Sequence, residues 1–225
     1  MTDALIPRPR RELGPGAVHV PGWLDVDRQR ELVAACRAWA SEGPGLRAAT
    51  LPSGHRMSVR TVCLGWHWIP YRYSRTRDDQ DGSPVAPFPA WLAELGRAAL
   101  ADAGSDRADV YRPDVALINF YEGDARMGQH RDVDERSDAP VVSLSLGAGC
   151  VFRFGNTDNR GRPYTDVHLL SGDLVVFGGP SRFAYHGVPR LLTDAGVPDI
   201  GLPGGRLNIT LRESGQSPSG SCAAV

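Results

Sequence analysis

The spacing of hydrophobic positions changes near residue 113 of the chain. Before that point, residues 25–42 and 89–103 carry apolar side chains three and four positions apart, which predicts two amphipathic helices. Asp25 or Asp27 can cap the start of the first helix. The side chains expected to point inward are Leu32, Val33, Cys36 and Trp39 in the first helix, and Trp91, Leu92, Leu95 and Leu100 in the second.

After residue 113 the apolar residues alternate or form short runs between glycine-rich turns, which is typical of β-strands. The predicted strands are residues 114–121, 141–147, 150–155, 166–179 and 206–212. The region between the helices, residues 43–88, is rich in Gly, Pro, Arg and aromatic residues, which indicates short strands and an exposed aromatic loop. Strands that follow two helices predict an α+β fold whose β part is a sandwich or jelly roll.

The length of 225 residues suits one domain, which we place at residues 17–214. Residues 1–16 are rich in Pro and Arg and are expected to form a flexible arm, and residues 215–225 a disordered tail. No apolar run is long enough to span a membrane, and the N-terminus lacks the apolar core of a secretory signal. We therefore expect a cytoplasmic protein without a membrane partner.

Composition removes several classes of function. The chain has 25 basic and 26 acidic residues and a net charge of −1, so indiscriminate binding to polyanions is not expected. All the basic residues are arginines, which excludes Schiff-base lysines, P-loop nucleotide sites and kinase-type lysines. The four cysteines are far apart and form no C-x-x-C pair, so neither a zinc knuckle nor a disulfide framework fits.

A candidate metal site consists of His130 and Asp132, two positions apart, together with the distant His186. Residues i and i+2 of an extended segment point the same way, so the first two side chains can face one metal ion. The second histidine would complete two imidazoles and one carboxylate, which is the facial set of non-haem iron(II) oxygenases. A surface histidine beside an aspartate would explain the H-x-D pair alone equally well.

The last predicted strand places Arg206, Asn208 and Arg212 on one face and apolar residues on the other. Buried arginines need anionic partners, and two guanidinium groups suit a dicarboxylate held at each end. The strand before His130 directs Asn119 and Tyr121 the same way. The alternative is that both arginines form ion pairs within the chain.

These features together resemble the AlkB family of Fe(II)- and 2-oxoglutarate-dependent dioxygenases, over roughly residues 16–214. The motifs that carry the resemblance are LINFYEGDARMGQHRDVDE (117–135), PVVSLSLG (140–147), FRFG (152–155), SGDLVVFGGPSRFAYHGV (171–188) and RLNITLR (206–212). The resemblance implies a double-stranded β-helix, or jelly roll, with N-terminal helices. Its core would lie at about residues 113–212 and its nucleotide-recognition lid at about residues 43–88.

The resemblance also assigns roles at the site. The residues implied to bind iron are His130, Asp132 and His186. Those implied to bind 2-oxoglutarate are Asn119, Tyr121, Arg206, Asn208 and Arg212, with Tyr121 and Arg206 at the distal carboxylate. Family members use O₂ and 2-oxoglutarate to hydroxylate an N-alkyl group on a nucleobase, and the hydroxylated carbon leaves as an aldehyde, which restores the base. The resemblance therefore implies repair of alkylated DNA or RNA by oxidative demethylation.

The implied partner is alkylated DNA or RNA, bound as a single strand or with a flipped base, and we expect a monomer. The residues implied to surround the nucleotide are Met57, Trp66, Tyr71, Tyr73 and Asp134. Trp66 would stack on the base, and Asp134 would face its exocyclic edge. The alternative for Trp66 is a core residue.

One position departs from the family pattern. Asp166 falls where a base-contacting arginine stands in well-known members, and Arg160 or Arg162 would have to replace that contact. The same chemistry on a small metabolite or a protein side chain is therefore an alternative. A non-catalytic nucleotide-binding module is a third hypothesis, which the complete triad and both arginines oppose.

Overall fold

The computed structural model describes residues 7–192 and 196–216, which form two helices and three antiparallel sheets. The helices are α1 (Val26–Ser41) and α2 (Ala90–Asp102), and a short 3-10 helix, η1, spans Gly179–Ser181. The strands are β1 (Arg11–Gly14), β2 (Ala17–Val20), β3 (Arg60–Leu64), β4 (His67–Ile69), β5 (Arg72–Ser74), β6 (Val115–Tyr121), β7 (Met127–His130), β8 (Val141–Gly147), β9 (Gly149–Phe154), β10 (Thr165–Leu169), β11 (Leu174–Phe177), β12 (His186–Leu192) and β13 (Arg206–Arg212).

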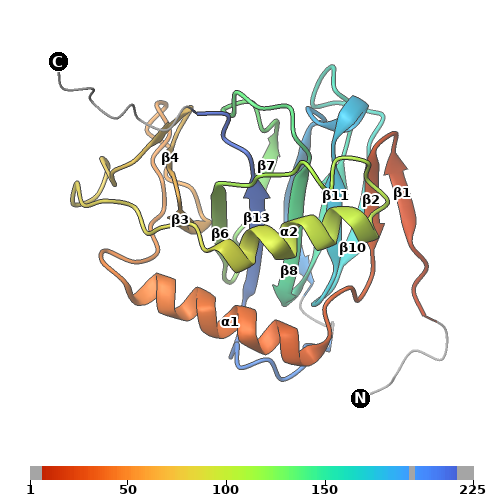
Figure 1. Ribbon diagram of the computed structural model, residues 1–225, viewed down its shortest axis with the longest axis horizontal. Coiled ribbons are helices and arrows are strands. Elements are labelled where there is room, and N and C mark those ends of the chain that lie inside the picture. Colours follow the sequence, from red (N-terminus) through yellow and green to blue (C-terminus); the bar gives the residue numbers. More distant parts are fainter. Residues whose placement is uncertain (1–6, 193–195, 217–225) are drawn as a thin grey trace.

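Two of the sheets face each other. The larger has the order β1-β2-β11-β8-β13-β6-β3, whose strands are labelled in Figure 1. The smaller has the order β10-β9-β12-β7, and β4 and β5 form a separate hairpin. An apolar layer fills the space between the two large sheets, with Tyr121 and Phe177 from one and Phe152 and Phe154 from the other. The α+β jelly roll expected from the sequence is confirmed.

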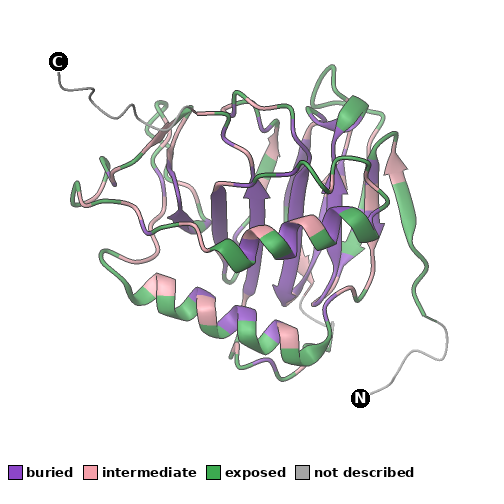
Figure 2. Ribbon diagram, viewed as in Figure 1, coloured by how far each residue is buried: buried purple, intermediate pink, exposed green. Residues whose placement is uncertain are grey.

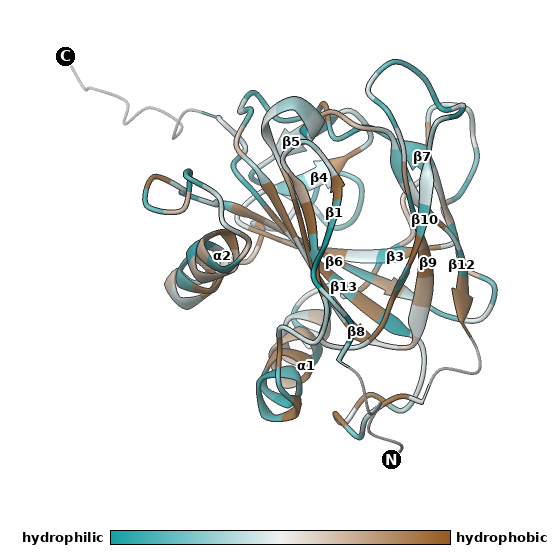
Figure 3. Cartoon of the chain, turned by 90° about the vertical axis from the view of Figure 1, so that its right-hand side faces the viewer, coloured by the Kyte–Doolittle hydropathy of each residue, from teal (hydrophilic) through white to brown (hydrophobic). Residues whose placement is uncertain are grey.

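Both helices cover the outer face of the larger sheet, on the side away from the smaller one (Figure 3). Leu32 of α1 and Leu92 of α2 belong to the same buried cluster as Leu207, Ile209 and Leu211 of β13. The central strands are almost wholly buried, whereas the outer faces of the helices are exposed (Figure 2). The alternation of β13 therefore divides its side chains between the helix layer and the interior of the jelly roll.

Asp25 caps α1 as predicted, because its carboxylate accepts a hydrogen bond from the backbone N–H of Arg28. The prediction for Trp91 was wrong, since this side chain is 37% exposed and is not part of the buried cluster between the helices and the sheet. Its ring lies 5.9 Å from that of Trp39, nearly parallel to it, with the Arg28 guanidinium 5.8 Å from its centroid. Trp91 therefore joins the two helices at their surface.

The stretch expected as one strand, residues 166–179, is two strands in different sheets. Gly172 makes the break, with a φ of +87° that favours glycine. A Cβ atom here would also lie 2.7 Å from the carbonyl oxygen of Leu24. The chain therefore crosses from β10 in the smaller sheet to β11 in the larger sheet at this turn.

The expectation of a flexible arm through residue 16 was wrong for the segment that the structure describes. Residues 11–14 form β1, which pairs with β2 at the edge of the larger sheet. Before it, the Arg8 guanidinium donates two hydrogen bonds to the buried carboxylate of Asp173. Residues 1–6 of the expected arm and 217–225 of the expected tail lie outside the described residues.

No helix within the described residues is long and apolar enough to cross a membrane.

Candidate metal centre and cosubstrate pocket

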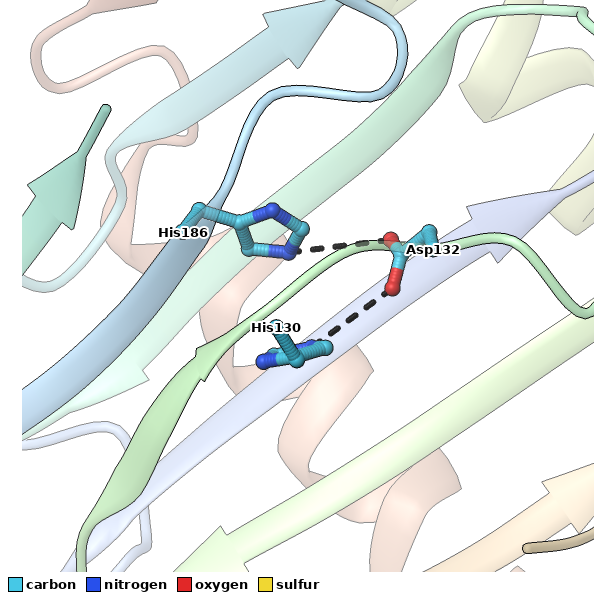
Figure 4. A group of neighbouring side chains, drawn as sticks. All are labelled: His130, Asp132 and His186. Carbon is cyan, nitrogen blue, oxygen red and sulfur yellow. Dashed lines mark ion pairs between the residues drawn. The ribbon is translucent and has the colours of Figure 1, made fainter. Parts of the chain in front are cut away.

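The three predicted metal ligands meet between two paired strands. His130 ends β7, His186 begins β12, and the two residues are directly opposite each other in the antiparallel pairing. Asp132 follows β7 by two residues and points at both rings (Figure 4). One ligand atom from each side chain lies within 4.8 Å of the others. These three residues can therefore reach a single ion.

Hydrogen bonds turn the same nitrogen of both imidazoles toward Asp132. His130 Nδ1 lies 3.0 Å from the carbonyl oxygen of Gly128, and His186 Nδ1 lies 3.0 Å from that of Ala184. Since a carbonyl only accepts, each Nδ1 donates and each Nε2 keeps its lone pair for a metal. The Nε2 atoms lie 3.5 and 3.7 Å from the Asp132 oxygens.

The charges at the centre also suit a cation. Burial lowers the pKa of His186 to about 4, so this imidazole is neutral near pH 7. Burial alone would raise the pKa of Asp132, but the charge of Arg212 outweighs it and holds that pKa well below its usual range. Burial would lower the pKa of His130, but the hydrogen bond and charge of Asp132 outweigh it and raise that pKa.

A cavity beside the triad contains the polar face of β13. Its lining includes Asn119, Tyr121, Met127, Phe152, Phe177, Arg206, Asn208, Thr210 and Arg212 as well as the triad. Asn119 and Asn208 are held by hydrogen bonds, the first from the Thr61 hydroxyl and the second to the Ser143 hydroxyl. The cavity thus brings together all the residues predicted to bind iron and 2-oxoglutarate.

Four buried polar atoms in this cavity have no hydrogen-bond partner: Asp132 Oδ2, Nε and Nη1 of Arg206, and Nε of Arg212. An unpartnered buried charge is costly, so the site suits a cation at Asp132 and an anion at the arginines. The donor set of two imidazoles and one carboxylate fits iron(II) with coordination positions left open. The residues present therefore fit both an iron ion and a carboxylate ligand.

The two arginines differ in their partners. Arg212 is paired at 2.8 Å with Asp132 Oδ1, so it lies at the metal end of the cavity. Arg206 donates to the Ser145 hydroxyl at 3.1 Å and has no carboxylate partner among the described residues. Its guanidinium carbon lies 5.1 Å from the ring centroid of Tyr121. The alternative of ion pairs within the chain therefore applies to Arg212 and not to Arg206.

Two further buried groups adjoin the triad and were not identified from the sequence. The carboxylate of Glu135 pairs with Arg212 at 2.9 Å and with Arg182 at 3.2 Å. Burial would raise the pKa of Glu135, but the charge of Arg212 lowers it, so the group is an anion. Both residues stand inside the quoted motifs, Glu135 three positions after Asp132 and Arg182 four positions before His186, and this proximity in sequence was the available signal.

Trp66 is buried, with 7% of its surface exposed, and it packs against Cys63 and Val115. Its indole N–H donates to Asp114 at 2.9 Å, and the guanidinium carbon of Arg75 lies 3.5 Å from its ring centroid. Trp66 is not among the residues that line the cavity at the triad. These contacts favour the alternative of a core residue over a stacking surface.

The neighbouring Trp68 is the tryptophan that contacts a predicted substrate residue. It is half-buried on β4, opposite Tyr73 of β5, and its indole N–H donates to Asp134 at 2.7 Å. Burial raises the pKa of this carboxyl group. Tyr71, at the tip of the hairpin, is 67% exposed, and Met57 is half-buried elsewhere in the lid. The family motif falls on Trp66, so the sequence does not identify Trp68.

Asp166 has a partner that explains its departure from the family pattern. It lies on β10 directly opposite Arg153 of β9, and the two side chains form a forked pair with both distances at 2.8 Å. Asp166 is exposed and does not line the cavity at the triad. Arg160 and Arg162 are also exposed, near the rings of Tyr185 and Tyr164 respectively.

Comparison with known proteins agrees with this site. The profile of the 2OG-Fe(II) oxygenase superfamily matches residues 16–212, so the chain belongs to that superfamily and is an iron(II)- and 2-oxoglutarate-dependent enzyme that uses O₂. Within it, the chain belongs to the AlkB family. It is 39% identical to an alpha-ketoglutarate-dependent dioxygenase AlkB homolog of Caulobacter vibrioides, over 89% of this chain and 88% of the relative.

Other relatives support the same family. Alpha-ketoglutarate-dependent dioxygenase AlkB of Escherichia coli is 38% identical, over 79% of this chain and 81% of the relative. The DNA N(6)-methyladenine demethylase ALKBH1C of Arabidopsis thaliana is 30% identical, over 88% of this chain and 48% of the relative. A solved structure of OsALKBH1 matches with a TM-score of 0.81 and 29% identity, over 91% of this chain and all of that one.

Proposed function

We propose that this enzyme removes alkyl groups from nitrogen atoms of nucleobases in DNA or RNA. The observation that carries the proposal is the complete triad beside a cavity with unpartnered arginine atoms, in a chain similar to AlkB proteins. The names of the Arabidopsis relatives include DNA demethylation, which supports a nucleic acid as the substrate. The hydroxylated methyl group would leave as formaldehyde.

The triad of His130, Asp132 and His186 would hold the iron, which supplies the activation of O₂ as 2-oxoglutarate is oxidatively decarboxylated to succinate and CO₂. Phe177 and Phe152 lie 4.9 and 5.9 Å from the His186 ring, measured between centroids. These aromatic rings would exclude water from one side of the centre. The remaining chemistry is positioning by the protein's own side chains.

The unpartnered Nε and Nη1 of Arg206 would bind the distal carboxylate of 2-oxoglutarate, beside Tyr121. Burial raises the pKa of Tyr121 to about 12, so its hydroxyl stays protonated and can donate a hydrogen bond. Arg212 and Asn208 would orient the other end, since Arg212 already contacts the metal ligand Asp132. Asn119 would complete the polar wall opposite Asn208, its partner in the β6–β13 pairing.

For the nucleobase we propose Trp68 rather than Trp66 as the aromatic surface of the lid. Trp68 is half-buried and bonded to Asp134, two residues from the metal ligand Asp132, whereas Trp66 is buried. An alkylated base that carries a positive charge would fit between an aromatic face and a carboxylate. Met57, Tyr71 and Tyr73 remain proposed lid contacts around the nucleotide.

The experiment compares one oligonucleotide with and without a single N-methylated adenine, in the presence of iron(II) and 2-oxoglutarate. N6-methyladenine in DNA is the first adduct to test, followed by N1-methyladenine in DNA and RNA. We expect formaldehyde only from a methylated strand, in amounts equal to the succinate above background. Succinate release that is unchanged by every methylated strand would show that the substrate is of another class.

We also propose that the enzyme acts as a monomer in the cytoplasm. All three metal ligands come from one chain, so the site needs no second copy. The cysteines Cys36, Cys63 and Cys150 are free and buried, which suits a reducing compartment. Light scattering on the purified protein, with a single-chain mass as the expected result, tests the first statement, and imaging of the tagged protein in its host tests the second.

A further inference from the structure

Glu135, which the proposed catalysis does not use directly, is the centre of a buried charge cluster. Its side chain has no exposed surface, and it accepts hydrogen bonds from three groups: Arg212, Arg182 and the hydroxyl of Tyr73. The Arg182 side chain is itself only 2% exposed. Such a cluster is costly to bury unless every charge is paired, so its geometry is constrained.

Both arginines of this cluster also contact Asp132, the metal ligand at the middle of the triad. Arg212 Nη2 pairs with the carboxylate of Asp132 at 2.8 Å, and Arg182 Nη1 donates to its backbone carbonyl at 2.8 Å. Arg182 also donates through Nε to the carbonyl of Ala139. Glu135 therefore holds the two side chains that fix Asp132, one at its backbone and one at its carboxylate.

The charges of the cluster balance only when Glu135 is present. Two guanidinium groups face two carboxylates, those of Asp132 and Glu135. Without Glu135, Arg212 would be free to turn both of its terminal nitrogens onto Asp132, and one positive charge would be left unpaired. Both effects oppose the binding of a cation at Asp132.

The fifth member, Tyr73, belongs to the lid. Its hydroxyl donates to Glu135, and it accepts a hydrogen bond from Arg212 at 3.4 Å. Burial raises the pKa of Tyr73 well above its usual value, so the hydroxyl keeps the proton that it donates. On the preceding strand of the same hairpin, the indole N–H of Trp68 donates a hydrogen bond to Asp134. The hairpin therefore contacts the loop after β7, which carries the metal ligand Asp132, at the carboxylates of Asp134 and Glu135.

We propose that Glu135 is a positioning residue, which binds one terminal nitrogen of Arg212 so that only the other pairs with Asp132. We also propose that Tyr73 couples the lid to the metal centre through its hydrogen bond to Glu135. A nucleotide that moves the β4–β5 hairpin would thereby change how firmly Asp132 is held. The role of Glu135 in metal binding is independent of the substrate. Only the response to a nucleotide rests on the proposed function.

The first test measures the affinity of the metal-free full-length protein for nickel(II), a stand-in for iron(II) that air does not oxidise, by titration calorimetry. Glu135→Gln keeps the size of the side chain and removes its charge. We expect its affinity to fall by about 10- to 100-fold, the usual effect of losing a group that supports a metal ligand. Glu135→Asp, which keeps the charge, should recover part of the loss.

The matched control is Asp173→Asn, which also neutralises a buried carboxylate paired with an arginine, but outside the metal site. Its nickel(II) affinity should equal that of the wild type, which separates positioning from a general loss of stability. Circular dichroism establishes that each variant is folded. An unchanged nickel(II) affinity in folded Glu135→Gln would overturn the role of Glu135.

The second test addresses Tyr73 without a nucleic acid. In nickel-loaded Tyr73→Phe, amide hydrogen exchange in residues 131–136 should be several-fold faster than in the wild type, because the lid no longer restrains the loop. The control is Tyr164→Phe, since Tyr164 packs against Arg153 outside the cavity. Exchange that matches the wild type in Tyr73→Phe would show that the lid is not coupled to Asp132.

The third measurement uses turnover with a methylated oligonucleotide. Tyr73→Phe should release more succinate per formaldehyde than the wild type, because cosubstrate oxidation is no longer linked to the position of the lid. An unchanged ratio would contradict this response. If the wild type itself demethylates no oligonucleotide, the proposed substrate fails, while the metal-binding and exchange measurements still decide the proposed coupling.

Discussion

Two tryptophans of the lid, Trp66 and Trp68, show how local contacts decide between a structural and a binding role. The indole N–H of Trp66 donates to Asp114, the Arg75 guanidinium lies over one face of its ring, and the side chain is buried in an apolar cluster. Trp68 directs its N–H to Asp134, near the metal ligands. A sequence motif identifies the pair, but only the contacts distinguish the two residues.

Replacing each tryptophan by alanine should have different consequences. Trp68→Ala should raise the KM for a methylated oligonucleotide, because stacking on an aromatic ring contributes about 1–3 kcal/mol per base, or about 5- to 150-fold. The KM for 2-oxoglutarate should stay near that of the wild type. Trp66→Ala should instead lower the unfolding temperature, since it leaves a cavity and removes one of the three hydrogen bonds that Asp114 accepts. A larger KM effect from Trp66→Ala would return the stacking role to that residue.

The arginines of β13 lead to a second kinetic prediction. Arg206→Gln should raise the KM for 2-oxoglutarate by about 10- to 150-fold, since hydrogen bonds to a charged group contribute about 1.5–3 kcal/mol. Arg212→Gln should also lower kcat, because its partner Asp132 is a metal ligand and the chelating end of the cosubstrate would be misplaced. Steady-state kinetics with 2-oxoglutarate varied will distinguish them. Two identical profiles would show that this division of roles is wrong.

At the scale of elements, the sequence predicts both helices and several of the strands. Both helices, the cap at Asp25 and the polar face of β13 follow from periodicity. Periodicity does not reveal the break at Gly172, because the apolar residues of β10 and β11 lie only a few positions apart and have the pattern of one long strand. It also missed β1, whose residues are exposed or half-buried and are ordered by pairing with β2 and by the Arg8–Asp173 contact.

Asp173 should therefore stabilise the N-terminal hairpin in a pH-dependent way. Burial alone would raise its pKa, but hydrogen bonds from His19 and Arg8 outweigh it and lower the pKa below its ordinary value of 3.8. The charged form is thus favoured by folding, so its stabilisation is complete above about pH 5 and is lost as the pH falls through the lowered pKa. Asp173→Asn should cost about 1.5–3 kcal/mol at pH 7, because it weakens the charge-assisted hydrogen bonds from the buried His19 and from Arg8, whose side chain is 36% exposed.

Urea unfolding of the wild type and Asp173→Asn between pH 3 and pH 7 measures this difference. The gap in unfolding free energy should stay constant near neutral pH and narrow below pH 3.8. A gap that is independent of pH down to pH 3 would mean that the carboxylate charge is not what stabilises the hairpin.

On the scale of the whole molecule, the two sheets bring residues from distant parts of the chain to one cavity. The smaller sheet supplies His130 and His186, and the larger supplies Arg206 and Arg212. The lid adds Tyr73 and Trp68 through contacts with the loop after β7. The sequence predicted the triad and the arginines as separate motifs. The contacts of Glu135 and Arg182 that join them became evident only in three dimensions.

Loss of one ligand should abolish metal binding without unfolding the protein. His130→Ala is the preferred change, because the His130 side chain is 35% exposed and the buried Asp132 keeps its ion pair with Arg212 when the ring is removed. We expect an unfolding temperature close to that of the metal-free wild type, together with loss of measurable nickel(II) binding. Wild-type affinity for nickel(II) in this variant would remove His130 from the metal site.

The most direct test of the account is the stoichiometry of products from the full-length protein with a methylated oligonucleotide. With iron(II), 2-oxoglutarate and O₂, we predict equal amounts of succinate and formaldehyde above the background measured with the unmethylated strand. Asp132→Ala, or zinc(II) in place of iron(II), should give neither product. Formaldehyde released without 2-oxoglutarate, or full turnover with zinc(II), would contradict the account.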